Sequence, residues 1–131
     1  MPSHVYFHPT LPALIRVLGS DFSVDIQDTL SREDIGLLDT APHKVYYIFD
    51  MTDVSISFED LSRGASSVAR GEAHTKYHHP NIIENLMIVQ SRMLELAAQN
   101  LKAPSLGGVN IKTFHTFEEA IAYIEQQSVS R

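Results

Sequence analysis

The chain has 131 residues, of which 44% are hydrophobic and 20% charged, a composition that indicates one globular domain over residues 1–131. The absence of cysteine excludes disulfides, thiolate nucleophiles and cysteine-ligated zinc. A net charge of −6 without a Lys/Arg cluster disfavours nucleic-acid binding, and no apolar run approaches the roughly 20 residues of a membrane span. The first residues show no signal-peptide pattern. We therefore expect a cytoplasmic protein that binds neither nucleic acid nor membrane.

The first third of the sequence predicts strands followed by a helix. Residues 4–7 and 13–19 are rich in β-branched, aromatic and aliphatic side chains, and residues 22–27 alternate apolar and polar types. The Gly-Ser-Asp step at 19–21 predicts a hairpin between the segments 13–19 and 22–27. Ser31 suits the N-cap of a helix over 31–41, with Asp34 near the positive end of its dipole.

The pattern changes after residue 43, where apolar runs begin to alternate with amphipathic segments. Strands are expected at 44–49, 85–90 and 109–114, and helices at 57–71, 91–103 and 115–127. Ser91 suits an N-cap, and Thr116 with Glu119 forms a capping box. A β-α-β-α-β-α order predicts a parallel sheet, to which the hairpin adds an antiparallel edge. We therefore predict an α/β fold with a mixed four- to six-stranded sheet flanked by helices.

Candidate binding residues follow the predicted parallel strands, because ligands of open α/β sheets bind beyond the carboxyl ends of their strands. Asp50, Thr52 and Asp53 follow the strand 44–49, and Ser91 and Arg92 follow the strand 85–90. Simpler roles compete: Asp50 can fix its own turn, and Ser91 can cap its helix. Arg92 opposes the dipole in a first helical turn, which favours an outward contact with a partner or an anionic ligand.

No catalytic motif accompanies these residues. An Asp, a Ser and a His (Asp50, Ser91 and His115) at neighbouring strand ends are the parts of a hydrolase triad, but the sequence has no G-x-S-x-G elbow. It also lacks a P-loop and a G-x-G-x-x-G fingerprint. We therefore assign no catalytic residue and no cofactor.

The segment HTKYHHPNI, residues 74–82, holds three of the seven histidines. His74 and His78 are four apart and would share one face of a helix, which makes them a weak alternative as a metal pair. Gly71 before them and Pro80 after them argue against a continuous helix. We expect a loop whose histidines hydrogen-bond locally and which leads rigidly into the next strand.

The order of motifs resembles a group of small bacterial proteins described as SpoIIAA-like, or STAS/SEC14-like. The resemblance is carried by Phe49, Asp50 and Thr52, then by His79-Pro80-Asn81, and finally by the residues Phe114, Thr116, Glu118, Glu119 and Ala120. It covers most of the chain after residue 44 and implies the fold of anti-anti-sigma proteins. The D-S-S-G loop that carries their phosphorylated serine is missing, since FDMTDVS is followed by ISFEDLS. Ser55 and Ser57 lie nearby, but neither occupies the matching motif.

The resemblance implies a non-enzymatic regulatory or protein-interaction module with a protein partner. Its binding face would comprise Asp50, Thr52, Asp53, Ser91 and Arg92. Self-association as a homodimer is a further expectation, because a small domain with an open sheet can pair through an edge or a helix face. The SEC14 side of the resemblance implies the alternative of a small apolar or anionic ligand, and an enzyme is the least favoured class.

Overall fold

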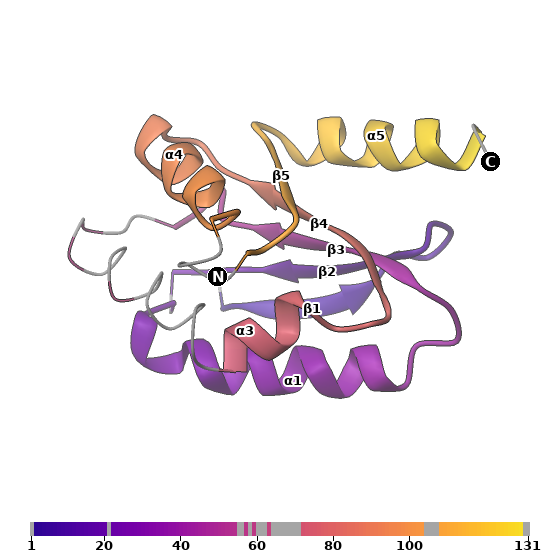
Figure 1. Cartoon of the computed structure of the whole chain (residues 1–131), viewed down its shortest axis with the longest axis horizontal. Coiled ribbons are helices and arrows are strands. Elements are labelled where there is room, and N and C mark those ends of the chain that lie inside the picture. Colours follow the sequence, from indigo (N-terminus) through magenta and orange to yellow (C-terminus); the bar gives the residue numbers. More distant parts are fainter. Residues whose placement is uncertain are drawn as a thin grey trace.

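The structure is a computed structural model that describes residues 2–20, 22–54, 57, 59, 63, 72–103 and 108–129, with only the backbone for 24, 72–74, 128 and 129. Its centre is a five-stranded sheet in the order β1-β2-β3-β4-β5 (Figure 1). The strands are β1 (His4–Phe7), β2 (Ala13–Val17), β3 (Val45–Asp50), β4 (Ile82–Ile88) and β5 (Ile111–Phe114). β1 pairs antiparallel with β2, and the other three pairings are parallel. The predicted mixed α/β sheet with an antiparallel edge is confirmed.

The N-terminal hairpin is present, but the prediction paired the wrong segments. β1 and β2 form it, with His4 opposite Val17 and Phe7 opposite Leu14. The expected strand at 22–27 is wrong, because a 3-10 turn, η1 (Val24–Ile26), occupies this stretch and leads into a helix. A short alternating run has too few residues to distinguish a strand from the first turn of a helix. Here the residues that follow it form a helix, and the run belongs to the start of that helix.

Helix α1 (Gln27–Asp39) begins four residues before the predicted cap. Ser31 is therefore not an N-cap but an interior residue of the helix, and it is fully buried. Asp34 is the eighth residue of α1 and lies away from its N-terminus, so the predicted position near the positive end of the helix dipole is also wrong. Its side chain is fully buried. The buried stripe of α1 is Gln27, Ser31, Asp34 and Leu38, a spacing of a single helix face on which three of four members are polar.

The strands β3, β4 and β5 follow one another in the predicted order. The helices α4 (Arg92–Asn100) and α5 (Phe117–Val129) lie where they were expected. Ser91 caps α4 by accepting a hydrogen bond from the Leu94 amide, 3.1 Å away. Thr116 caps α5 through the Glu119 amide at 3.1 Å. The helix predicted over 57–71 falls outside the described residues except at 57, 59 and 63.

The two faces of the sheet carry separate apolar layers. Leu14, Tyr47 and Phe49 point to the side that is covered by α1, α4 and the short helix α3 (Glu72–Tyr77). Ile15, Ile48 and Leu86 point to the opposite side, where α5 contributes Ala120 and Ile124. Alternation of side chains along β2 therefore assigns Arg16, between Ile15 and Val17, to the α1 side.

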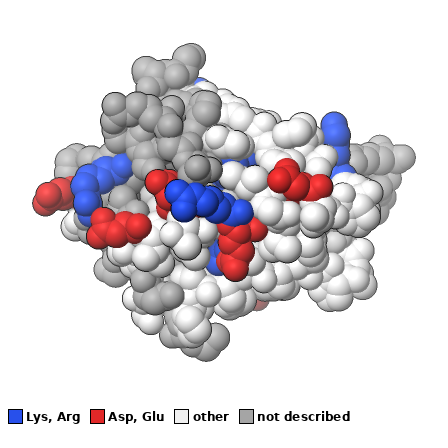
Figure 2. Space-filling view, turned by 90° about the horizontal axis from the view of Figure 1, so that it is seen from below, with Lys and Arg blue, Asp and Glu red and all other residues white. Residues whose placement is uncertain are grey.

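The surface carries both signs of charge. Figure 2, which looks at the molecule from the α1 side, shows acidic and basic side chains interspersed over the described part of that face. Within the described part of the chain, no helix has the length and hydrophobicity needed to cross a bilayer.

Candidate functional site

The five predicted face residues lie at the carboxyl ends of two adjacent strands, with Asp50 as the last residue of β3 and the other four after β3 or β4. β3 and β4 are parallel neighbours with Asp50 opposite Ile88, so the residues after them leave the sheet at the same edge. Thr52, Asp53, Ser91 and Arg92 are exposed, and Asp50 is partly exposed. The prediction that both segments lie at one edge agrees with the sheet order.

Two of these polar side chains hold their own backbone. The Asp50 carboxylate accepts hydrogen bonds from the amide and the hydroxyl of Thr52, with the amide 2.9 Å away. Ser91 is occupied as the cap of α4. Arg92 reaches Glu95 at 3.6 Å, but 77% of its side chain is exposed, so it presents its charge to solvent. The arrangement therefore offers exposed charge on a rigid turn and a capped helix.

The histidine segment is more helical than predicted. Residues 72–77 form α3, so the expected loop is wrong for His74 to Tyr77, and only His78 to Asn81 connect α3 to β4. Among the described residues, no three side chains of metal-binding type lie close enough to hold an ion. The side chain of His74 is outside the described part, so the pairing of His74 with His78 stays untested.

The H-P-N motif ties the start of β4 to the end of α1. His79 Nε2 lies 2.7 Å from the Asp39 carboxylate, and its Nδ1 accepts a hydrogen bond from the Asn81 amide at 3.1 Å. The Asn81 side chain donates to the carbonyl oxygen of Leu38 at 2.8 Å. Local hydrogen bonding by this segment is confirmed for His79, and its role is to fix the C-terminal end of α1.

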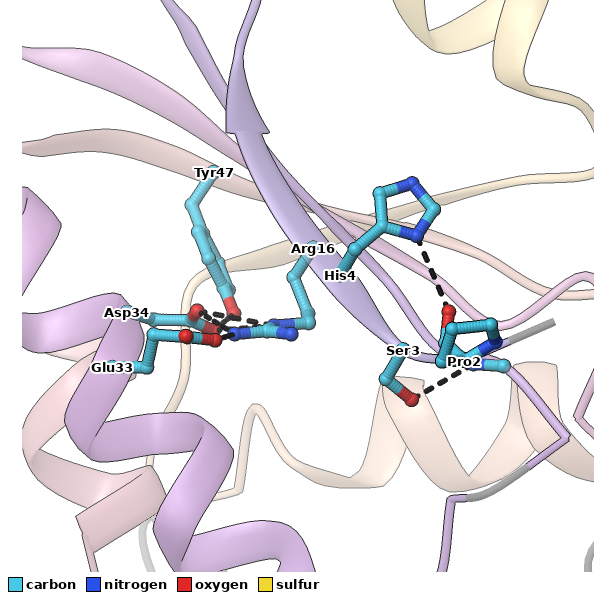
Figure 3. Close-up of polar contacts among 8 residues, drawn as sticks. Pro2, Ser3, His4, Arg16, Glu33, Asp34 and Tyr47 are labelled. Carbon is cyan, nitrogen blue, oxygen red and sulfur yellow. Dashed lines mark hydrogen bonds and ion pairs between the residues drawn. The ribbon is translucent and has the colours of Figure 1, made fainter.

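A buried ionic cluster that was not predicted from the sequence lies between α1 and the sheet. Figure 3 shows Arg16 of β2 directed at Asp34 of α1. The guanidinium donates to the Asp34 carboxylate through Nε at 3.0 Å and Nη2 at 2.6 Å, and both side chains are fully buried. Asp34 also accepts a hydrogen bond from the Tyr47 hydroxyl, and Arg16 Nη2 also contacts Glu33, whose side chain is 57% exposed. A buried ion pair needs such additional hydrogen bonds to offset its desolvation.

A second buried cation, Lys76 of α3, belongs to the same cluster. Its Nζ lies 4.6 Å from the ring centre of Tyr77, 4.7 Å from that of Phe49 and 5.4 Å from that of Tyr47. Burial lowers the pKa of Lys76 to about 8, against the opposing effect of the Asp34 carboxylate. The aromatic rings favour the ammonium form, since a cation is attracted to the ring faces.

Burial also raises the pKa of the two tyrosine hydroxyls. The pKa of Tyr77 rises strongly because of desolvation, and that of Tyr47 rises for the same reason, with a further contribution from the Asp34 charge. Both hydroxyls therefore stay protonated through the range in which Lys76 titrates. Tyr47 links the two halves of the cluster, because its ring contacts Lys76 and its hydroxyl contacts Asp34.

Several polar atoms of this region have no hydrogen-bond partner among the described residues. They are buried atoms of four side chains: Arg16 Nη1, Asp28 Oδ1, Ser31 Oγ and Asn85 Oδ1. Three of the four lie in β2 or α1, and Asn85 lies in β4. These atoms can therefore still form hydrogen bonds, and leaving each of them unpaired costs roughly 1–3 kcal/mol.

A signal for this cluster was present in the sequence. Arg16 interrupts the apolar run ALIRVL, and an arginine inside an otherwise buried strand requires a carboxylate partner. Asp34 shares one helical face with Leu38 and Leu30, which points it inward. The predicted helix began at Ser31, so the first residues of α1 were left out and the inward-facing stripe from Gln27 to Leu38 was not recognised.

Comparison with solved structures identifies the fold. The crystal structure of an uncharacterised protein of the DUF3478 family with a SpoIIAA-like fold, from Shewanella loihica PV-4, matches 94% of this chain and 92% of that chain. The TM-score is 0.51 and the sequence identity 12%, so the likeness concerns the fold alone. No protein-family model matches the sequence, and no curated protein matches it. The chain has a SpoIIAA-like fold, as the order of its motifs predicted.

Proposed function

We propose that the chain is a non-enzymatic protein-interaction module of the STAS-like type, working in the cytoplasm. Its partner binds a surface that we call the α4 face, which comprises Arg92, Met93 and Leu96 of α4 with the neighbouring strand-end residues Asp50, Thr52, Asp53 and Ser91. The observation that carries the proposal is exposed apolar surface beside exposed charge on one helix. Met93 and Leu96 are 39% and 49% exposed, the latter more than any other large apolar side chain of the described residues.

Helical spacing brings these side chains together. Met93 and Leu96 are three residues apart, and Arg92 and Leu96 four apart, so all three are neighbours on one side of α4. The opposite side of the helix packs Leu94, Ala98 and Leu101 against the sheet. An apolar centre with a charged rim is the usual composition of a protein interface.

The polar members of the face support binding rather than catalysis. Asp50 and Ser91 are engaged with backbone amides, which makes them scaffold for the turn and the helix start. Arg92 and Asp53 remain as exposed charges of opposite sign. The partner is therefore expected to contribute an apolar contact together with complementary charges on its rim.

Site-specific photo-crosslinking inside the native cells tests this proposal. A benzophenone amino acid replaces Leu96 in one variant and Ala122, an exposed residue of α5 on the other side of the sheet, in the control. We expect a discrete crosslinked species from position 96 only, and its loss when Arg92→Glu is added. A species of twice the chain mass would identify the partner as a second copy. Equal crosslinking from both positions, or none from position 96, would refute the proposed face.

A further inference from the structure

The outer edge of β1 is an open strand edge at the far end of the sheet from α4. Among the described strands, β1 stands last in the sheet order with β2 as its one neighbour, whereas α4 packs beside β5 at the other end. We propose that two copies of the chain dimerise by antiparallel pairing of β1 with β1, which joins their sheets into one. This pairing leaves α4 of each copy free, so the dimer presents α4 twice.

The strand register shows which backbone groups of β1 face outward. The His8 amide donates to the Ala13 carbonyl oxygen, 2.9 Å away, in the same register that pairs β1 with β2. Hydrogen-bonded pairs alternate along an antiparallel ladder, so the backbone of Tyr6 also faces β2. The backbone groups of Val5 and Phe7 therefore point away from β2. Each of these two residues offers one donor and one acceptor to a further strand.

The side chains along this edge include exposed aromatic rings. Tyr6 and Phe7 are each 39% exposed, and with Met93 and Leu96 they make up the exposed large hydrophobic residues of the described chain. The ring of Tyr6 stacks on that of His4, with the ring centroids 5.9 Å apart. Aromatic side chains on paired strands add cross-strand packing to the backbone hydrogen bonds. The edge therefore offers both components of strand pairing.

Charge selects a second copy of the chain as the occupant of this edge. The chain has a net charge of −6, so two copies repel each other overall. Residues 1–15 contain no Asp, Glu, Lys or Arg, and the first such side chain, Arg16, is fully buried. Natural proteins commonly protect an open strand edge with charged side chains, lysine above all, and β1 has none. The neutral edge is therefore where two acidic chains can approach with little repulsion.

One symmetric register uses every outward backbone group of β1. It pairs Val5 of each copy with Phe7 of the partner subunit, so that each donor meets an acceptor. The two-fold axis then passes between the two copies of Tyr6, which face each other as a close, non-hydrogen-bonded pair. A shift that pairs Phe7 with its own copy sets Val5 against Pro9, which has no amide hydrogen. The opposite shift pairs Phe7 with Ser3, which lies outside β1.

Cysteine substitution tests this register, because the natural chain has no cysteine and each variant has a single thiol. Tyr6→Cys places the thiols of the two copies across the axis, where a Cα separation of about 4.5 Å allows a disulfide. Phe7→Cys is the matched control, because its two thiols lie diagonally, with Cα atoms about 7–8 Å apart or more, too far for a disulfide. Leu96→Cys tests α4 as an alternative contact between copies.

A second pair of variants tests the backbone hydrogen bonds. Phe7→Ala and Phe7→Pro both remove the ring, but proline also removes the outward amide, which β2 does not use. Sedimentation velocity of the purified, untagged chain should cover about 1–200 μM, because a small interface is expected to have a micromolar dissociation constant. Phe7→Pro should raise this constant about 30-fold over Phe7→Ala, because half of the inter-strand hydrogen bonds are lost.

We expect the wild-type chain to dimerise in this range, and mild oxidation to crosslink Tyr6→Cys but neither Phe7→Cys nor Leu96→Cys. A wild-type chain that stays monomeric throughout, or a dimer equally stable in Phe7→Pro and Phe7→Ala, would overturn the proposal. Circular dichroism shows whether Phe7→Pro is folded, and if it is not, the cysteine variants decide. No disulfide in Tyr6→Cys would reject the β1 dimer, and an equally fast one in Phe7→Cys would reject the register.

The same variants separate this dimer from the function proposed for the α4 face. A disulfide in Leu96→Cys without one in Tyr6→Cys would place the second copy on α4, which supports the α4 face and overturns the β1 dimer. Absence of a crosslinked species from position 96 in cells would refute the α4 face and leave the β1 dimer standing. The two proposals therefore fail separately.

Discussion

Replacing Asp34 by Asn should destabilise the protein severely. The substitution preserves the shape of the side chain but removes the charge that faces the fully buried Arg16, leaving only Glu33, which is 57% exposed. Removing one partner of a buried ion pair typically costs about 3–5 kcal/mol. For 131 residues, an unfolding entropy near 2.1 cal/mol/K per residue converts this loss into a fall in melting temperature of roughly 11–18 °C.

Urea and thermal unfolding measure the loss, and two variants bracket it. Glu33→Gln removes the exposed carboxylate from the same guanidinium and should cost less than about 1 kcal/mol. The double variant Arg16→Met with Asp34→Leu removes both charges and should recover much of the loss, because apolar replacements of a buried pair are often neutral or stabilising, although the buried Tyr47 hydroxyl then loses its acceptor. A loss of under 1 kcal/mol in Asp34→Asn, or a double variant as unstable as Asp34→Asn, would contradict a dominant role of the unpaired Arg16 charge.

Three further predictions concern other titrating or capping groups. Between pH 8 and 10 the free energy of unfolding should rise by about 2 kcal/mol, because Lys76 then largely keeps its proton in the unfolded chain but not in the folded one. The rise should be absent in Lys76→Met, and above pH 10 stability should fall, since unfolding releases the Tyr77 proton. The hydrogen bond to Glu84 at 2.6 Å raises the pKa of Tyr123 to about 12, so Glu84→Gln should lower it in an ultraviolet tyrosinate titration. Ser91→Ala should cost about 1 kcal/mol in urea unfolding and Ser91→Asn much less, whereas equal losses would contradict the cap.

The strands β3, β4 and β5 and the helices α4 and α5 were predictable because their signals in the sequence are redundant. β3 and β4 contain continuous apolar runs, β5 alternates apolar and polar residues, and α4 and α5 begin at side-chain caps that the structure contains. The segment 22–27 was assigned as a strand from one weak pattern, the alternation of apolar and polar residues, without considering the residues that follow it. Its true partner in the chain is α1, and only the stripe from Gln27 to Leu38 discloses this.

The candidate face was placed at one edge from sequence alone, since consecutive parallel strands deliver their following residues to the same edge. The buried cluster was not found, because it requires knowing that β2, α1 and α3 converge. Arg16 and Asp34 are 18 positions apart, and Lys76 arrives from a segment that was predicted to be a loop. Periodicity describes each element separately and says nothing about which polar positions of different elements meet.

The single arginine in β2 also restricts how the sheet can assemble. Sliding β2 by one residue against β3 would turn every β2 side chain to the other face and carry the Arg16 guanidinium into the layer of Ile48, Ala120 and Ile124. Among the described residues, Asp34 on the α1 side is the only fully buried carboxylate, and the partly buried Glu84 of the opposite side is engaged by the Tyr123 hydroxyl. The shifted arrangement would bury an unpaired charge, whereas an all-apolar β2 would tolerate it far better. Arg16 thereby enforces one strand alignment, a contribution to the uniqueness of the native state that a measurement of its stability alone would not detect.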